Sequence, residues 1–274
     1  MRLSLRSRIL FLLAVLGALG ALGSDAAGAT SLSEVKARGK LVMLTFPDME
    51  SAFIRVDVDQ GLDHYTGIDY EVLSGFARSL GVTLEVRPVK PGFADLVPTL
   101  LRGEGDIVAS SFSITPERRE KVDFTEPYFG VRTVVVVPKE SPIHSLADLA
   151  GRTGSAVRGS SLEAEIQKLG NVKLHYVDFM RWNYDALMEK EADFTVLEEP
   201  FVWRLLDSYP DLKVAFALPG KDAYGFAVAP GSDLRFALDT YLAQIKADGK
   251  LDAIARKHLG DRAESGVTER DRAR

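Results

Sequence analysis

The stretch GDIVASSFSITPERREKVDFTEPYF, residues 105–129, turns from apolar to polar at the end of what reads as a buried strand. Three serines and an arginine follow that strand: Ser110, Ser111, Ser113 and Arg118. Sheets of α/β proteins hold ligands beyond the carboxyl ends of their strands, and a guanidinium assisted by hydroxyls is a good partner for a carboxylate. The stretch therefore indicates a carboxylate site, a polar loop that caps a helix at Thr115-Pro116, or both.

Strand-like and helix-like segments alternate along the rest of the chain. Strands are predicted at 40–46, 82–89, 106–111, 132–139, 153–159, 173–177, 193–199, 212–218 and 223–230. Helices are predicted at 69–81, 93–105, 145–151, 161–170, 179–192, 199–210, 233–249 and 250–260. Such alternation is typical of mostly parallel sheets covered by helices.

The alternation falls into two units joined by apolar strands near 131–137 and 222–227. This arrangement predicts an α/β fold of two lobes, in which two parallel or mixed sheets with flanking helices are joined by two hinge strands. A cleft between lobes is a natural ligand site, and closure about a hinge is a known mode of switching. The predicted boundaries are a signal peptide at 1–29, a first lobe at 30–132 and 226–260, a second lobe at 133–225, and a disordered tail at 261–274.

The N-terminus reads as a cleaved secretory signal peptide. Three arginines precede an apolar run at 9–22, and the small residues of 27–29 suit a signal peptidase. A membrane anchor is the alternative, but the run is shorter than the roughly 20 apolar residues that a span needs. The chain has no cysteine, which rules out a lipid anchor on cysteine, disulfides and thiol chemistry. We therefore expect a periplasmic protein that is not a lipoprotein.

Composition excludes several classes of function. The net charge is −5 and no basic stripe is present, so nucleic acid is not expected as a partner. The chain lacks the GxxxxGK[ST], GxGxxG, HExxH and GxSxG motifs, and its four histidines have no ligand spacing. No metal, cofactor or catalytic residue is therefore predicted.

Several stretches resemble the bacterial extracytoplasmic solute-binding proteins of family 3, the periplasmic amino-acid-binding components of ABC importers. The stretch at 105–129 is similar to the family signature, and TGIDYEVLSGFARSLGV (66–82) to its G-F-D-x-D-L motif. SLADLAGRTGSAVRGSS (145–161) and ADGKLDAIARKHLG (247–260) match its second-lobe motif and closing helix. The resemblance covers nearly all of 39–260 and implies the type II periplasmic-binding-protein fold.

The resemblance implies roles for the polar residues at the carboxylate end of the ligand. The arginine that clamps the ligand α-carboxylate corresponds to Arg118. Ser111 and Ser113 correspond to positions that bind the same end, and Ser110 is a further candidate. Ser161 corresponds to a second-lobe hydroxyl at a helix N-terminus, where the dipole suits an anion; it could instead only cap that helix.

The acid that pairs with the ligand ammonium corresponds to Glu198, in place of the family's usual aspartate. Glu199, beside it, is a rival, and either residue could only begin the next helix. Phe93 corresponds to an aromatic residue against the ligand side chain, or is a core residue. The family's stacking tyrosine is replaced by Glu50, and Phe46 could substitute for it. Arg158 could face the cleft and favour an anionic side chain, or be solvated.

The expected function is capture of an amino acid or related small zwitterion in the cleft and its delivery to an ABC permease in the inner membrane, by a monomer without enzymatic activity. One alternative is a sensing module for cell-wall-derived ligands, because residues 172–228 also resemble the solute-binding domain of membrane-bound lytic transglycosylases. The other is an enzyme similar to cyclohexadienyl dehydratases, whose catalytic glutamate corresponds to Phe201 here.

Overall fold

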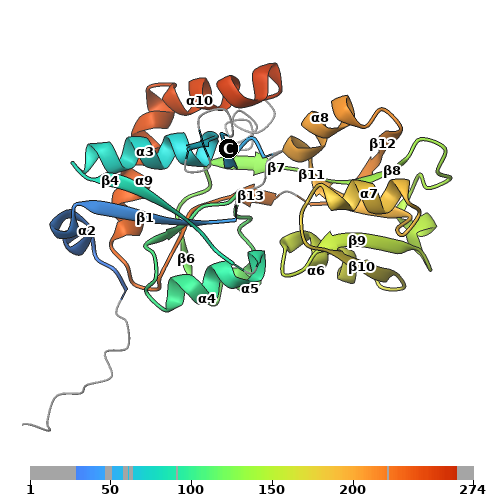
Figure 1. The fold of residues 1–274 in the computed structure, drawn as a ribbon, viewed down its shortest axis with the longest axis horizontal. Coiled ribbons are helices and arrows are strands. Elements are labelled where there is room, and N and C mark those ends of the chain that lie inside the picture. Colours follow the sequence, from blue (N-terminus) through green and yellow to red (C-terminus); the bar gives the residue numbers. More distant parts are fainter. Residues whose placement is uncertain are drawn as a thin grey trace, which may run out of the picture.

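A computed structural model of the chain describes residues 29–46, 51–57, 61, 64–90, 92–220 and 222–263. The predicted signal peptide up to residue 28, Glu50 and the predicted tail beyond Ala263 lie outside these residues. Figure 1 shows two lobes side by side, each built around its own sheet. None of the helices in the described part of the chain is long and apolar enough to cross a membrane.

The first lobe is built on a sheet of order β4-β1-β5-β14-β6. Its strands are Thr83–Pro88, Lys40–Thr45, Ile107–Val108, Ala227–Val228 and Asp123–Phe124. β1 runs parallel to β4 and β5, and β14 is antiparallel to its neighbours. The helices of this lobe are α2 (Leu32–Arg38), α3 (Ile68–Ser79), η1 (Phe93–Asp95), α4 (Leu96–Leu101), α5 (Pro116–Arg119), α9 (Leu234–Ala247) and α10 (Lys250–Leu259). A short hairpin of β2 (Arg55–Val56) and β3 (Tyr65–Thr66) lies beside them.

Helices of the first lobe form where apolar residues recur at helical spacing. α9 buries Leu234, Leu238, Leu242 and Ile245, which lie on one face of a helix. α3 likewise buries Val72, Leu73 and Phe76, and both helices contribute to one core with β1 and β5. This core packs against β1 and β5, which matters because the polar turn after β5 faces the second lobe.

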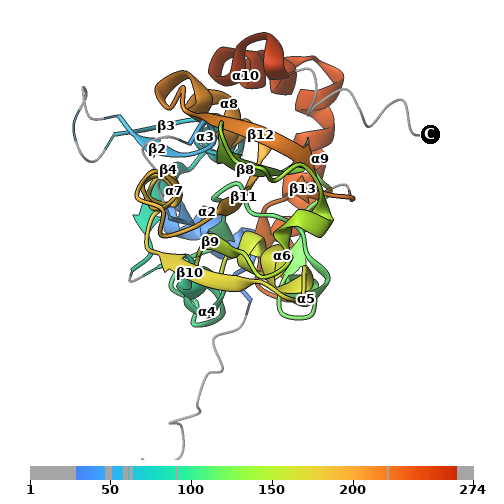
Figure 2. The same ribbon diagram turned by 90° about the vertical axis from the view of Figure 1, so that its right-hand side faces the viewer.

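The second lobe is built on a sheet of order β10-β9-β11-β8-β12. This lobe faces the viewer in Figure 2. Its strands are Lys173–Val177, Thr153–Val157, Phe194–Glu198, Thr133–Pro138 and Leu212–Ala217. β9, β10 and β11 are parallel, and β8 is antiparallel to β11 and β12. The helices are η2 (Leu146–Leu149), α6 (Ser161–Lys168), α7 (Trp182–Met188) and α8 (Glu199–Ser208).

Two short strands connect the lobes. β7 (Phe129–Val131) and β13 (Asp222–Tyr224) pair antiparallel in a separate sheet between the two large ones (Figure 1). The Thr133 hydroxyl donates to Asp222 at 2.9 Å, which ties the start of β8 to β13. The chain therefore passes between the lobes along two neighbouring strands.

Several predicted segments differ from the structure. The strand predicted at 223–230 is divided into β13 and β14, because the chain turns at Gly225 and Phe226 from the joining sheet to the first lobe. The strand at 106–111 ends at Val108, and the helix at 179–192 is shortened to α7. Residues 261–263, placed in a disordered tail by the sequence analysis, belong to η3 (Gly260–Ala263), and Ala263 is buried.

Candidate ligand-binding site

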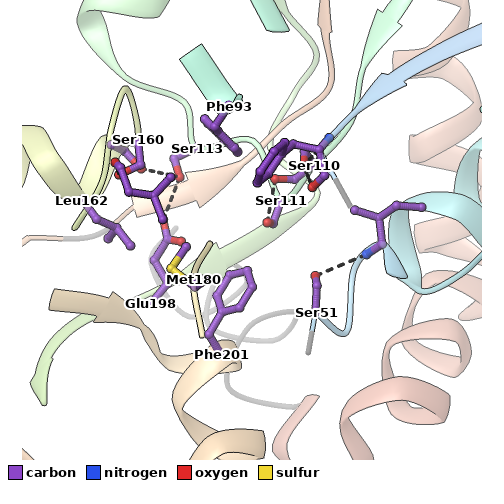
Figure 3. Close-up of a pocket in the computed structure, with 14 residues that line it drawn as sticks. Ser51, Phe93, Ser110, Ser111, Ser113, Ser160, Leu162, Met180, Glu198 and Phe201 are labelled. Carbon is purple, nitrogen blue, oxygen red and sulfur yellow. Dashed lines mark hydrogen bonds between the residues drawn. The ribbon is translucent and has the colours of Figure 1, made fainter. Parts of the chain in front are cut away.

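A pocket lies between the two lobes, at the carboxyl ends of β5, β9 and β11 (Figure 3). It encloses about 530 Å³ of empty space, counting the part open to solvent. One part of its wall is apolar: Phe46, Ile54, Phe93, Val157, Leu162, Met180 and Phe201. The other part consists of six serines and one carboxylate: Ser51, Ser110, Ser111, Ser113, Ser160, Ser161 and Glu198. Seven of the nine residues predicted for the site therefore line one pocket.

The turn after β5 is held in an unusual conformation. Ser111 has a φ of +45°, which residues other than glycine rarely adopt. Its backbone N–H donates to Asp69 Oδ2 at 2.8 Å, and its hydroxyl donates to the carbonyl of Ser110 at 2.6 Å. Because strained backbone persists only where the surroundings fix it, Asp69 positions the turn that carries Ser111 and Ser113.

Asp69 is fully buried at the start of α3, where it also accepts a hydrogen bond from the Tyr128 hydroxyl. Burial raises the pKa of Asp69 from 3.8 to about 7, although the bonds from Tyr128 and Ser111 favour the charged form. An acid with a raised pKa binds its proton more tightly in the folded state than in the unfolded state. Its contribution to stability is therefore present below pH 3.8 and is lost as pH rises through about 7.

We accordingly expect Asp69→Asn to remove this part of the pH dependence of folding. As pH rises from 4 to 7, the wild-type protein should lose free energy of unfolding relative to Asp69→Asn, because only the wild-type side chain must give up a proton inside the protein. Urea unfolding at several pH values between 4 and 8 measures the difference. Stability curves that stay parallel over this range would contradict the expectation.

Glu198 ends β11 and stands opposite the turn after β5. Its Oε1 accepts a hydrogen bond from the Ser113 hydroxyl at 2.7 Å, and its Oε2 accepts one from the Tyr224 hydroxyl at 2.9 Å (Figure 3 shows the first). Burial raises the pKa of Glu198 from 4.5 to about 7, although these bonds and the charge of Arg118 favour its ionised form. A carboxylate has about four acceptor positions, so two remain for another donor.

Glu198, rather than Glu199, faces the pocket. Glu199 points away and forms an ion pair with Arg132 at 2.8 Å. Glu198 occupies the position just before α8, but its side chain makes no capping bond to that helix. The possibility that Glu198 only begins the helix is therefore not supported by the geometry, because its oxygens bind groups of the first lobe and the joining strand instead.

Arg118 lies next to the pocket rather than in its wall. Its Nη1 donates to the carbonyl of Ser113 at 2.8 Å, and its guanidinium lies 4.0 Å from the centre of the Phe112 ring and 5.4 Å from that of Phe93. Burial lowers the pKa of Arg118 to about 10, an effect that the charge of Glu198 opposes, so the side chain stays cationic at neutral pH. The predicted cap is confirmed, since Thr115 accepts the N–H of Arg118 at 3.2 Å.

Ser161 reaches across from the second lobe. Its hydroxyl donates to the Ser113 hydroxyl at 3.1 Å, whereas the cap of α6 is Ser160, which accepts the N–H of Glu163. The capping role that the sequence left open for Ser161 therefore belongs to its neighbour. This frees the Ser161 hydroxyl to act in the pocket.

Aromatic residues close one side of the pocket. Phe46 packs edge-to-face on Phe93 at 6.2 Å and stacks on Phe179 of the second lobe at 5.8 Å. Arg158, predicted to favour an anionic side chain, is not brought into the pocket by the structure. It is exposed, and its guanidinium lies 3.7 Å from the centre of the Tyr176 ring, which holds it outside.

Sequence reasoning missed Tyr224 and Asp69 as parts of the site. Tyr224 is fully buried on β13 and pairs with Ser113 through a backbone bridge, which brings its hydroxyl to Glu198. No spacing along the chain links residue 224 with residue 198. Asp69 had a signal, because an aspartate in the first turn of an apolar helix must find donors if it is buried.

The site and the fold define a class of protein, one with a candidate ligand pocket between two α/β lobes. Residues 50–261 match the family of bacterial extracellular solute-binding proteins, family 3. The chain belongs to this family, as the sequence motifs predicted. The fold is accordingly the two-lobed type II periplasmic-binding-protein fold, with mixed sheets and two joining strands.

Individual relatives are of two kinds. The amino-acid-binding protein AabA of Dichelobacter nodosus is 28% identical over 72% of this chain and 80% of its own length. Membrane-bound lytic murein transglycosylase F of Desulfosudis oleivorans is 29% identical over 83% of this chain, which spans only 50% of that relative. Among solved structures, the substrate-binding protein AbpA of Streptococcus pneumoniae, bound to L-arginine, has a TM-score of 0.77 and 27% identity over 83% of this chain and 97% of its own.

Proposed function

We propose that this protein captures an amino acid or a closely related zwitterion between its lobes and delivers it to an ABC importer of the inner membrane. One observation carries the proposal: a buried carboxylate on the second lobe faces hydroxyls and a guanidinium on the first. A zwitterion needs an anionic and a cationic partner a few ångströms apart, and Glu198 and Arg118 supply the two charges. The curated relatives named as amino-acid-binding proteins support the same ligand class.

In the proposed complex, the ligand ammonium donates to the free acceptor positions of Glu198. The ligand carboxylate accepts hydrogen bonds from the hydroxyls of Ser111, Ser113 and Ser161 and from the guanidinium of Arg118. Binding therefore replaces the bond from Ser113 to Glu198 and the bond from the Ser111 hydroxyl to the carbonyl of Ser110. Phe93 and Phe46 take the side-chain end of the ligand.

The proposed division into lobes keeps the predicted boundaries, with 30–132 and 226–260 in the first lobe and 133–225 in the second. We further propose a periplasmic location, reached through a signal peptide cleaved after Ala29, and a monomer as the working form. Membership of a family of extracellular solute-binding proteins supports a place outside the cytoplasm.

A second candidate is a sensing module for cell-wall fragments, which the similarity to transglycosylase F supports. The dehydratase alternative has less support. Position 201, where those enzymes carry a glutamate, is a phenylalanine that lies in the apolar wall and has no proton to transfer.

The test is a ligand screen on the purified mature protein. Thermal shift with the common L-amino acids, short peptides and soluble muropeptides finds binders, because a ligand that prefers the folded state raises the melting temperature. Calorimetry then measures affinity. An L-amino acid as the tightest ligand supports the proposal, and a muropeptide that binds when all amino acids fail overturns it in favour of the second candidate.

A substitution at Gly159 tests closure of the lobes. This residue has a φ of +74°, and a Cβ there would lie 2.5 Å from the Cβ of Ala94 on the opposite lobe. Gly170 has a φ of +85°, but a Cβ there would meet nothing within 4 Å. Both glycines thus have a left-handed backbone, but only at Gly159 would a Cβ meet the opposite lobe.

We expect Gly159→Ala to weaken ligand binding and Gly170→Ala to leave it unchanged. Both variants should lose about 1–2 kcal/mol of stability from left-handed backbone strain. Overpacking at the closed cleft adds about 1–3 kcal/mol for Gly159→Ala alone, or roughly 5- to 150-fold in affinity. Calorimetry and urea unfolding on both variants separate the effects. Equal affinities would show that the ligand is held without this contact.

A further inference from the structure

The pocket wall combines a small group of polar side chains with a larger apolar surface. The hydrogen-bonding groups that remain available gather around Glu198, Ser113 and Ser161, whose side chains bond to one another. The seven apolar side chains of the wall form the rest, and Figure 3 shows Leu162, Met180 and Phe201 grouped beside Glu198. A ligand anchored by its ammonium and carboxylate at these polar groups would therefore place its side chain against the apolar side chains of the wall.

Four of the six pocket serines have hydroxyls that already bond to nearby backbone, and one of them, Ser111, donates to the carbonyl of Ser110 at 2.6 Å. Ser51 accepts the N–H groups of Phe53 and Ile54 at 3.1 and 3.3 Å. Ser110 both donates to and accepts from the backbone of Phe46. Ser160 donates to the carbonyl of Val157 at 2.6 Å and caps α6. Ser110, Ser111 and Ser160 could therefore donate to a ligand only by breaking a bond to a backbone carbonyl, whereas Ser51 acts as the acceptor in both of its bonds.

The charges near the pocket also disfavour a charged ligand side chain. Among the described residues of its wall, Glu198 is the one ionisable group, and the ligand ammonium uses it. Arg118 lies 5.4 Å from the centre of the Phe93 ring, so its charge repels a cation placed on that ring. Arg158, which could have paired with an anionic side chain, is held outside over Tyr176.

Resting on the proposed function, we propose that the ligand is an amino acid with an uncharged, apolar side chain, aliphatic or aromatic. The side chain is selected by the wall formed by Ile54, Phe93, Leu162, Met180 and Phe201. Burying apolar surface there is favourable, whereas burying an unpaired guanidinium or carboxylate is costly. Such a ligand differs from the L-arginine that is bound in the solved relative AbpA.

Calorimetry on the wild-type protein tests the proposal with L-alanine, L-leucine, L-methionine, L-phenylalanine, L-arginine, L-lysine and L-glutamate. We expect at least one of leucine, methionine and phenylalanine to bind about 10- to 150-fold more tightly than alanine, and the charged amino acids to bind more weakly than that best ligand. Tightest binding of arginine, lysine or glutamate overturns the inference but leaves the proposed function standing. Binding of none of the seven, with muropeptide binding in the earlier screen, overturns both.

A matched pair of variants at Met180 adds a test of the wall itself. Met180→Glu places a carboxylate in the apolar wall of the pocket, whereas Met180→Leu keeps the wall apolar. We expect Met180→Glu to lower the affinity for the best apolar ligand at least tenfold and to raise that for arginine, and Met180→Leu to change neither by more than about threefold. Unchanged affinities in a folded Met180→Glu protein overturn the inference. If that variant does not fold, the wild-type ligand series decides by itself.

Discussion

Glu198→Gln should lower the affinity for an amino-acid ligand by roughly 30- to 5,000-fold. Removing one partner of a buried, hydrogen-bonded charge pair costs about 2–5 kcal/mol, which converts to that range. The glutamine keeps the length of the side chain, and its one amide oxygen still accepts a hydrogen bond from the hydroxyl of Ser113 or of Tyr224. What is lost is the negative charge opposite the ligand ammonium. Calorimetry with the best ligand from the screen measures the change.

The pH dependence of binding adds a second signature. In the proposed complex the ionised form of Glu198 binds the ligand ammonium, and burial raises the pKa of Glu198 in the free site to about 7. As pH falls below about 7, protonation of Glu198 competes with the ligand, and the affinity of the wild-type protein should drop by up to about tenfold for each pH unit. Above about pH 7 the affinity should level off. Glu198→Gln has no proton to gain at this position and should lose this part of the dependence.

Glu199→Gln is the matched control for both measurements. Residue 199 is adjacent in the chain, but its carboxylate pairs with Arg132 outside the pocket. We expect wild-type affinity and a wild-type pH profile from this variant. A large loss in Glu199→Gln with none in Glu198→Gln would reverse the assignment. Full affinity in both would remove the ammonium site from this part of the cleft.

The sequence was most informative where a local rule decides the structure. Thr115 followed by proline predicts a helix start, and the structure has one there because the threonine hydroxyl accepts a free N–H of the first turn. The helix at 233–249 was predicted from its apolar spacing and forms α9. The two-lobed fold followed from such segments together with the family motifs.

Contacts between distant segments could not be predicted in the same way. The choice between Glu198 and Glu199 depends on where β11 ends and on which of its sides faces the first lobe, because Glu198 is the last residue of the strand and Glu199 the first of α8. Arg158 has a polar neighbourhood in the sequence, but the ring of Tyr176 holds it outside the pocket. Tyr224 reaches Glu198 from β13, beside its backbone bridge to Ser113, and no pattern along the chain predicts that pairing.

The position of Arg118 suits the role proposed for it at the carboxylate end of the ligand. Its guanidinium is fixed by the carbonyl of Ser113 and lies over the ring of Phe112, so the charge is oriented before a ligand arrives. A preorganised partner loses little conformational freedom on binding. Arginine also presents several donors in one plane, so the N–H groups that Ser113 does not use remain for a carboxylate.

We therefore expect Arg118→Ala to cost about 2–5 kcal/mol of binding free energy, or roughly 30- to 5,000-fold in affinity. Arg118→Lys should recover only part of this loss, because an ammonium cannot replace the planar set of donors. The measurement is calorimetry with the same ligand, together with thermal unfolding to confirm that each variant is folded.

Arg119→Ala provides the matched control, since this neighbouring arginine is exposed and its guanidinium lies 5.8 Å from the Phe124 ring, away from the pocket. It removes the same charge from the same short helix, so any long-range electrostatic effect should be similar in both variants. An equal loss of affinity in Arg118→Ala and Arg119→Ala would mean that Arg118 acts only through this long-range electrostatic effect. Undiminished affinity in folded Arg118→Ala would place the ligand carboxylate elsewhere in the cleft.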